Sequence, residues 1–153
     1  MDIVYCSKWW LKNSQPIDIM NINLAKEKHF RGEYYTAVIS ENNRINYVLN
    51  ISQDYIVVRF MNVNIKPYLI YEFHRIKDDD IFLKAVYFYQ YDGEKRAEEM
   101  TFSFEQDGTV YMEKINLLSS EVKEKKGKVD VSCNWDKFPE FGEYENLFIK
   151  DRA

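Results

Sequence analysis

Apolar and polar positions alternate along most of the middle of this chain, over residues 30–117. Period-two alternation puts one set of side chains on a buried face and the other in water, which is the pattern of a β-strand. Short polar turns interrupt it at Glu41-Asn42-Asn43, Ser52-Gln53-Asp54 and Gln106-Asp107-Gly108. The pattern therefore predicts an antiparallel β-meander.

The strands of this meander differ in how many faces they bury. Residues 100–104 alternate most cleanly, with Met100, Phe102 and Phe104 on one face. Residues 81–91 are apolar on both faces, so this strand is expected to be covered on both sides or to line an interior. The Asp107-Gly108 dipeptide predicts a tight hairpin near the end of the meander.

The two ends of the chain have weaker patterns. Residues 3–11 fit a strand or one amphipathic turn, and residues 17–24 fit a short strand or a helical lead-in. Residues 119–127 combine a serine cap, helix-forming side chains and a terminal glycine, which predicts a short exposed helix or a solvated hairpin loop. Alternation resumes at residues 129–133, as in a last strand.

These elements predict a mainly β fold, a single antiparallel meander of about seven or eight strands. Such a sheet must protect its edges, and it does so best by closing into a barrel or curling into a half-barrel, with short helical elements near the termini. An open two-sheet sandwich is the alternative. With no repeat and no linker composition, residues 1–153 are expected to form a single domain.

Composition narrows the function. No apolar run approaches the roughly 18 residues of a membrane-spanning helix, and the N-terminus has no export signal, so we expect a cytoplasmic protein with no membrane partner. The net charge of −4 argues against nucleic-acid binding and fits a basic partner. Tyr 12, Phe 10 and Trp 3 in 153 residues are suited both to strands and to protein interfaces. The two cysteines are expected to be reduced thiols, and no metal or cofactor is expected.

Few residues point to catalysis. His74 and Glu72 would share one face of a strand, as a base and its orienting carboxylate do, but a plain surface pair is the preferred interpretation. His29 lies among charges, where we expect it to be solvated. Asp78-Asp79-Asp80 could bind calcium, form a solvated turn, or present negative charge to a basic partner. We expect no enzyme here and no catalytic residues.

Two acidic stretches are candidate surfaces for a basic partner, because a patch of one sign steers association with the opposite sign. Residues 92–107 have a local balance of −4, and residues 136–145 have a balance of −3 with aromatic side chains interleaved. Those aromatics could instead plug the end of the barrel. The candidate partner-binding residues are Asp92, Glu94, Glu98, Glu99, Asp136, Glu140, Glu143, Tyr144 and Glu145.

Two family resemblances add expectations. Phe30-Arg31-Gly32-Glu33-Tyr34-Tyr35 resembles the Gly-x-Trp segment at the first strand of lipocalins, with Tyr34 in the place of the tryptophan. The turns and tail are acidic, and the strand sequences are aromatic and poor in glycine, for example Ala85-Val86-Tyr87-Phe88-Tyr89-Gln90-Tyr91. In these features the chain as a whole resembles immunity proteins of bacterial contact-dependent growth inhibition and related polymorphic toxin systems. This second resemblance implies a small cytoplasmic inhibitor that binds and blocks a toxin domain.

This resemblance, together with the acidic composition, favours a non-enzymatic immunity protein that occludes a basic cognate toxin, of which a nuclease is one candidate. The alternative is a lipocalin-like binder of a small apolar ligand inside the barrel. The inhibitor and the ligand-binding hypotheses predict different barrel interiors. In the first, side chains such as Tyr87, Tyr89, Phe102 and Phe104 fill the interior. In the second, they line a void of several hundred Å3, a size typical of ligand cavities.

Overall fold

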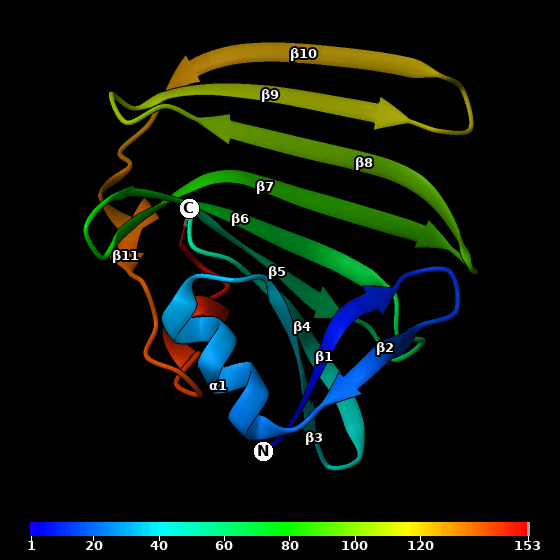
Figure 1. Ribbon diagram of the computed structural model, residues 1–153. Coiled ribbons are helices and arrows are strands. Elements are labelled where there is room, and N and C mark those ends of the chain that lie inside the picture. The colour runs from blue at the N-terminus through cyan, green and yellow to red at the C-terminus, as the bar shows by residue number, and fades with distance from the viewer. Residues whose placement is uncertain (153) are drawn as a thin grey trace.

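The fold is one large antiparallel sheet that curls around a helix and the C-terminal segment (Figure 1). The computed structural model describes residues 1–152. Its strands are β1 (Asp2–Trp10), β2 (Gln15–Met20), β3 (Tyr35–Glu41), β4 (Arg44–Ile51), β5 (Tyr55–Met61), β6 (Pro67–Lys77), β7 (Asp80–Asp92), β8 (Lys95–Phe104), β9 (Thr109–Asn116), β10 (Glu121–Lys128) and β11 (Trp135–Lys137). The helix α1 spans Ile22–Arg31, and the 3-10 turns η1 and η2 span Ser132–Asn134 and Glu145–Phe148.

The strand order is β10-β9-β8-β7-β6-β5-β4-β3-β1-β2, so the mainly β, antiparallel prediction is confirmed. Closure into a barrel is not found within residues 1–152, because β10 and β2 are free edges of an open sheet. The edges are protected in other ways. The outermost strand β10 is rich in lysine, and β2 carries Pro16 together with Asp18 at a φ of 56°.

The sheet divides at β7. The first part of this strand pairs with the short β11, from Asp80 to Phe82, and the part from Ala85 onward pairs with β8. Strands β8, β9 and β10 therefore extend away from the curled portion as a three-stranded unit, at the top of Figure 1. We refer to β8–β10 as the flap.

The N-terminal elements resolve both alternatives left by the sequence. Residues 3–11 contribute to strand β1, and the helix begins at Ile22 after β2 ends at Met20. The Asn21 side chain caps α1 by accepting a hydrogen bond from Leu24 N at 2.9 Å. Gly32 ends the helix in the left-handed conformation, with a φ of 71°.

The prediction for residues 119–127 is wrong: they contribute to β10, which pairs with β9 along its whole length, from Glu121 opposite Asn116 to Lys128 opposite Thr109. A neighbouring strand with free backbone groups overrides the weak helical preference of lysine and glutamate. The predicted strand at residues 129–133 is also not formed; the chain there turns through η1 and pairs only at β11.

The main core lies on the concave side of the curled portion. Its largest fully buried side chains include Tyr35, Phe60, Phe73 and Phe82 from the sheet. The C-terminal segment adds Tyr144 and Leu147, which are buried against them. The tail is therefore an integral part of the core rather than an appendage.

Candidate functional site

The C-terminal acidic stretch is held beside the acidic turn between β6 and β7. Strand β11 places Lys137 opposite Asp80, and the next residue, Phe138, donates its N–H to Asp79 O at 2.7 Å. Lys137 also forms an ion pair with the Asp80 carboxylate. These links bring together two groups of acids that lie about 60 positions apart in the chain.

Arg75 fixes the shape of the turn at residues 78–80. Its guanidinium donates to Asp78 O at 2.5 Å and to Asp79 Oδ1 at 2.9 Å. The same group lies over the Phe138 ring, 4.2 Å from its centroid. Because Arg75 and Lys137 bind two of the three aspartates, the triplet presents less free charge than its sequence indicates.

The exposed acids of this region form what we call the acidic tail surface: Asp78, Asp79, Glu140, Glu143 and Glu145. The last four, with Phe138 and neighbouring residues, line a hollow of about 550 Å3. Glu140, Glu143 and Glu145 are exposed, and within residues 1–152 none of them forms an ion pair. The surface thus carries at least three carboxylates whose charge is not neutralised by the protein.

Two predicted partner-binding residues from the same stretch have structural roles instead. Tyr144 is 1% exposed, and its hydroxyl lies 3.1 Å from that of Tyr35 and 3.4 Å from that of Tyr5. A side chain enclosed in this way cannot reach a partner, so the prediction for Tyr144 is corrected. Tyr144 packs in the main core of the curled sheet.

Asp136 belongs to the attachment of the tail. It forms an ion pair with the buried Arg152 and accepts a hydrogen bond from Asn146 Nδ2 at 2.9 Å. Burial by itself would raise the pKa of Asp136, but hydrogen bonds from Asn146, Lys137 N and Arg152 outweigh it and hold this pKa below its ordinary value. The Asp136 carboxylate is therefore neutralised by Arg152 within the chain.

His29 connects α1 with the tail. Its Nδ1 lies 2.8 Å from the Tyr35 hydroxyl, and its ring packs against Phe138 and Phe141. His29 is half-buried against β3 and the tail, so the expectation of a fully solvated histidine is wrong. Burial lowers the pKa of His29, although the nearby Glu140 carboxylate opposes the shift. The hydroxyls of Tyr5, Tyr144 and Tyr35 thus form a chain that ends at His29.

The first acidic stretch lies elsewhere and is partly neutralised. Glu98 pairs with Lys114 at 3.5 Å, and Glu99 pairs with Arg96 at 3.0 Å. Asp92 and Glu94 are exposed at the turn between β7 and β8. That turn is at the opposite end of β7 from Asp80, about 40 Å away along an extended strand. The nine predicted residues therefore do not form one site.

The catalytic alternative centres on His74 and Glu72. His74 Nε2 lies 3.7 Å from Glu72 Oε1, and the Tyr87 hydroxyl donates to Glu72 Oε2 at 3.3 Å. Both partners are partly exposed on the outer side of the sheet. Cys6 and Cys133 are free thiols, the first buried and the second exposed. No three His, Cys, Asp or Glu side chains gather as a metal site in the described part of the chain.

The aromatics proposed to line a barrel interior do not share one face. Register places Phe102 and Phe104 on the concave face, whereas Tyr87 lies opposite Thr101, on the outer face with Tyr89. The concave side of the curled portion is occupied by Tyr144, Leu147 and Phe148. The space where a lipocalin-like ligand would lie is thus filled by the protein's own tail.

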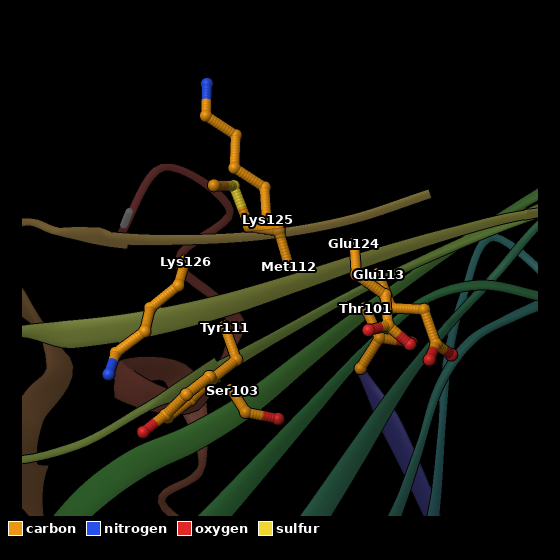
Figure 2. A pocket seen from close by; sticks show the side chains of 8 residues that line it. All are labelled: Thr101, Ser103, Tyr111, Met112, Glu113, Glu124, Lys125 and Lys126. Atoms are coloured by element: carbon orange, nitrogen blue, oxygen red, sulfur yellow. The ribbon is translucent and has the colours of Figure 1, made fainter. Parts of the chain in front are cut away.

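A broad hollow of about 600 Å3 marks the outer face of the flap, and Figure 2 shows its lining. Tyr111, Glu113, Glu124 and Lys126 lie on the same side of the strands as Thr101 and Ser103. Lys126 sits over the Tyr111 ring at 5.5 Å. Charges of both signs alternate here, so this hollow has no single electrostatic character.

Comparisons with protein-family models, with curated proteins and with solved structures found no match. Across residues 1–152, the one α-helix is too short to cross a bilayer. The function therefore has to be argued from the surface itself.

Sequence reasoning missed the residues that organise the acidic tail surface. Arg75, His29 and Arg152 stand far from one another in the chain, and none lies in a recognisable motif. Each gains its role from the docking of the tail against the curled sheet, which no local pattern reports. The only sequence signal was the acidic and aromatic composition of residues 136–145.

Proposed function

We propose that this protein is a non-enzymatic inhibitor, an immunity protein that binds a basic toxin domain through the acidic tail surface and occludes its active surface. The observation that carries the proposal is the group of exposed, unpaired carboxylates of Glu140, Glu143 and Glu145 around one hollow. We place this activity in the cytoplasm, with a protein as the partner rather than a nucleic acid or a membrane.

The arrangement of the tail supports recognition by a preformed surface. Buried and exposed residues alternate over its last part, so that Tyr144 and Leu147 anchor the backbone while Glu143 and Glu145 remain in water. An anchored backbone avoids the cost of ordering a loop on binding, which favours affinity. A ring of fixed negative charge also accelerates encounter with a basic partner.

The same reasoning favours the tail over residues 92–107. Lys114 and Arg96 already neutralise Glu98 and Glu99, so a basic partner would have to compete for those carboxylates. Surface ion pairs contribute little, but their presence removes the net field that steers a partner. Within the first stretch, Asp92 and Glu94 remain as exposed acids and provide a matched comparison.

The test is co-expression of the tagged chain with its neighbouring reading frames, followed by identification of bound proteins. The expected result is a stoichiometric basic protein that is toxic when expressed alone and harmless in the complex. The double variant Glu143→Lys/Glu145→Lys should lose at least about tenfold in affinity, whereas Asp92→Lys/Glu94→Lys, with the same change in charge, should retain it within about twofold.

Two results would contradict the proposal. Purification of the chain with only a bound lipid or metabolite would favour a ligand-binding role. Equal loss of affinity in both double variants would show that net charge, rather than the acidic tail surface, governs binding.

A further inference from the structure

The inner face of the flap is covered only at one end, where Phe104 and Val110 are buried in the main core. In Figure 1, α1 and the segment after β11 lie over the curled portion of the sheet, and the chain leaving β10 passes only the end of β8 and β9 near Gly108. A sheet face that carries apolar side chains is ordinarily buried against a second layer. The remaining apolar side chains on this face therefore lack the second layer that ordinarily buries them.

Strand register defines what this face presents. Residues directly opposite each other in neighbouring strands point to the same side of the sheet. Two rows cross β7, β8, β9 and β10 in this way: Val86, Phe102, Met112 and Lys125, and then Phe88, Met100, Lys114 and Lys123.

Of the apolar residues in these rows, Val86 is buried, Met100, Phe102 and Met112 are half-buried, and Phe88 is exposed. Phe88 is 43% exposed, and its ring meets that of Phe102 edge-on at 5.9 Å. Met100, Phe102 and Met112, with the lysine and glutamate side chains beside them, line a hollow of about 380 Å3. The patch is continuous with the main core, since Phe102 and Met112 pack against it. Exposed apolar surface that extends a core in this manner marks an interaction site.

The charges around the inner face of the flap indicate which kind of partner could cover it. Lys114 pairs with Glu98 at 3.5 Å and Lys123 pairs with Glu121 at 3.8 Å, which leaves Lys125 as the lysine of the two rows without an ion pair in residues 1–152. The face is thus apolar at its centre and almost neutral at its edge. A strongly charged partner gains little from such a face, whereas two copies of it meet without repulsion.

We propose that the inner face of the flap is the interface between two copies of this chain, packed face to face as a dimer. A two-fold axis parallel to the strands, between β8 and β9, would place Phe102 against Met112 of the second copy. The same axis brings Lys123 over the Phe88 ring of the second copy, a cation–π arrangement.

The size of the face is sufficient for a dimer. Four strands about 4.8 Å apart, with about eight residues at about 3.3 Å each, make about 500 Å2 per copy and about 1,000 Å2 in total, the lower range of specific interfaces. The lysines of β10 discourage edge-to-edge pairing, so the face rather than the edge is used. The acidic tail surface shares no residue with this face and stays free for the proposed toxin.

The experiment is sedimentation velocity of the full chain from about 1 to about 100 µM. A dimer of twice the 18.5 kDa chain mass is expected to form across this range. Met112→Lys should raise the dissociation constant at least about tenfold. Tyr111→Lys is the control, because Tyr111 neighbours Met112 on β9 and points to the opposite side, as Figure 2 shows.

Phe88→Lys repeats the test at a side chain that is already half exposed, in case Met112→Lys disturbs folding. A wild-type chain that stays monomeric at about 100 µM would overturn the proposal. Equal weakening by Tyr111→Lys and by both inner-face variants would place the interface elsewhere and overturn it as well. Neither outcome affects the proposed function, which is measured on another surface.

Discussion

Gly108 is the residue that ties the turn between β8 and β9 to the chain leaving β10. Its φ is 94°, and its carbonyl accepts a hydrogen bond from Val129 N at 2.8 Å. A Cβ atom at this position would lie 2.5 Å from Val129 O. The position therefore needs glycine for two reasons, the backbone conformation and the lack of space.

We predict that Gly108→Ala lowers the free energy of unfolding by about 2 to 3 kcal/mol, because left-handed strain adds to displacement of a backbone carbonyl. Gly93→Ala is the matched control. Gly93 has a φ of 65° and nothing within 4 Å of a built Cβ, so it should lose only about 1 kcal/mol. Urea unfolding of both variants measures the difference. Equal losses would contradict the contact with Val129.

Residue type alone could not predict which acids of the tail are exposed and which are paired inside the fold. Asp136 and Glu145 are equally acidic in the sequence, yet Asp136 pairs with the buried Arg152 while Glu145 faces water. Tyr144 sits between two glutamates and is nonetheless enclosed. Local composition predicted the character of this surface, but the choice between inside and outside depends on which side of the tail docks on the sheet.

The tail is anchored by buried tyrosine hydroxyls that ionise less readily in the folded chain than in the unfolded chain. Burial raises the pKa of Tyr5, Tyr35 and Tyr144 well above the ordinary value of 10.0, as does mutual repulsion of their ionised forms. When a folded-state pKa is raised, the stability from that group is present below the unfolded pKa and is lost as the pH rises above it. The loss should therefore begin near pH 10.

We predict that the free energy of unfolding falls by about 1.4 kcal/mol per pH unit for each of these tyrosines above pH 10, or about 4 kcal/mol per unit for all three. Tyr144→Phe should reduce the slope by about 1.4 kcal/mol per pH unit. Tyr55→Phe, at an exposed tyrosine, should leave it unchanged. Urea unfolding at several pH values gives the slopes. A slope unaffected by Tyr144→Phe would contradict the buried hydroxyl chain.

Strands were predictable from the sequence wherever a strand buries one face, because its apolar and polar residues then alternate. Residues 100–104 alternate cleanly and lie within β8, and the Asp107-Gly108 turn joins β8 to β9 as expected. Strand β10 was not predicted, because both of its faces are exposed and its pattern carries no period. What makes it a strand is the free edge of β9, a tertiary feature that its own residues do not encode.

At the scale of the whole molecule, the sheet consists of a covered portion and an uncovered one. The strands of the curled portion bury one face under α1 and the tail, whereas the flap joins the core only at its Phe104 and Val110 end and otherwise depends on backbone pairing. The sequence predicted antiparallel strands in a barrel or half-barrel, and the sheet is open, since closure depends on how the tail fills the concave side. That filling is a property of the assembled core.

This division predicts unequal local stability. At concentrations where the chain is monomeric, backbone amides of β9 and β10 should exchange with deuterium at least about tenfold faster than those of β4 and β5, because opening the flap exposes little additional apolar surface. Hydrogen exchange followed by NMR or mass spectrometry measures this. Uniform protection across the sheet would mean that the flap and the curled portion open as one unit.

The charge of the whole molecule affects the rate constant for association with the proposed partner. The formal net charge is −4, so reversal of two acids brings it to zero wherever the two acids lie. If the whole charge steered association, Glu143→Lys/Glu145→Lys and Asp92→Lys/Glu94→Lys would slow it equally. Because the Debye length is about 8 Å at physiological salt, local charge should dominate instead.

We expect the wild-type association rate constant to fall about tenfold between about 50 and about 500 mM salt. The Glu143/Glu145 variant should associate slowly at all salt concentrations, with a nearly flat dependence. The Asp92/Glu94 variant should keep most of the wild-type dependence, since its turn lies about 40 Å from the tail along β7. Stopped-flow mixing with the purified partner measures all three. A steep salt dependence that survives in the Glu143/Glu145 variant would place the steering charge outside the acidic tail surface.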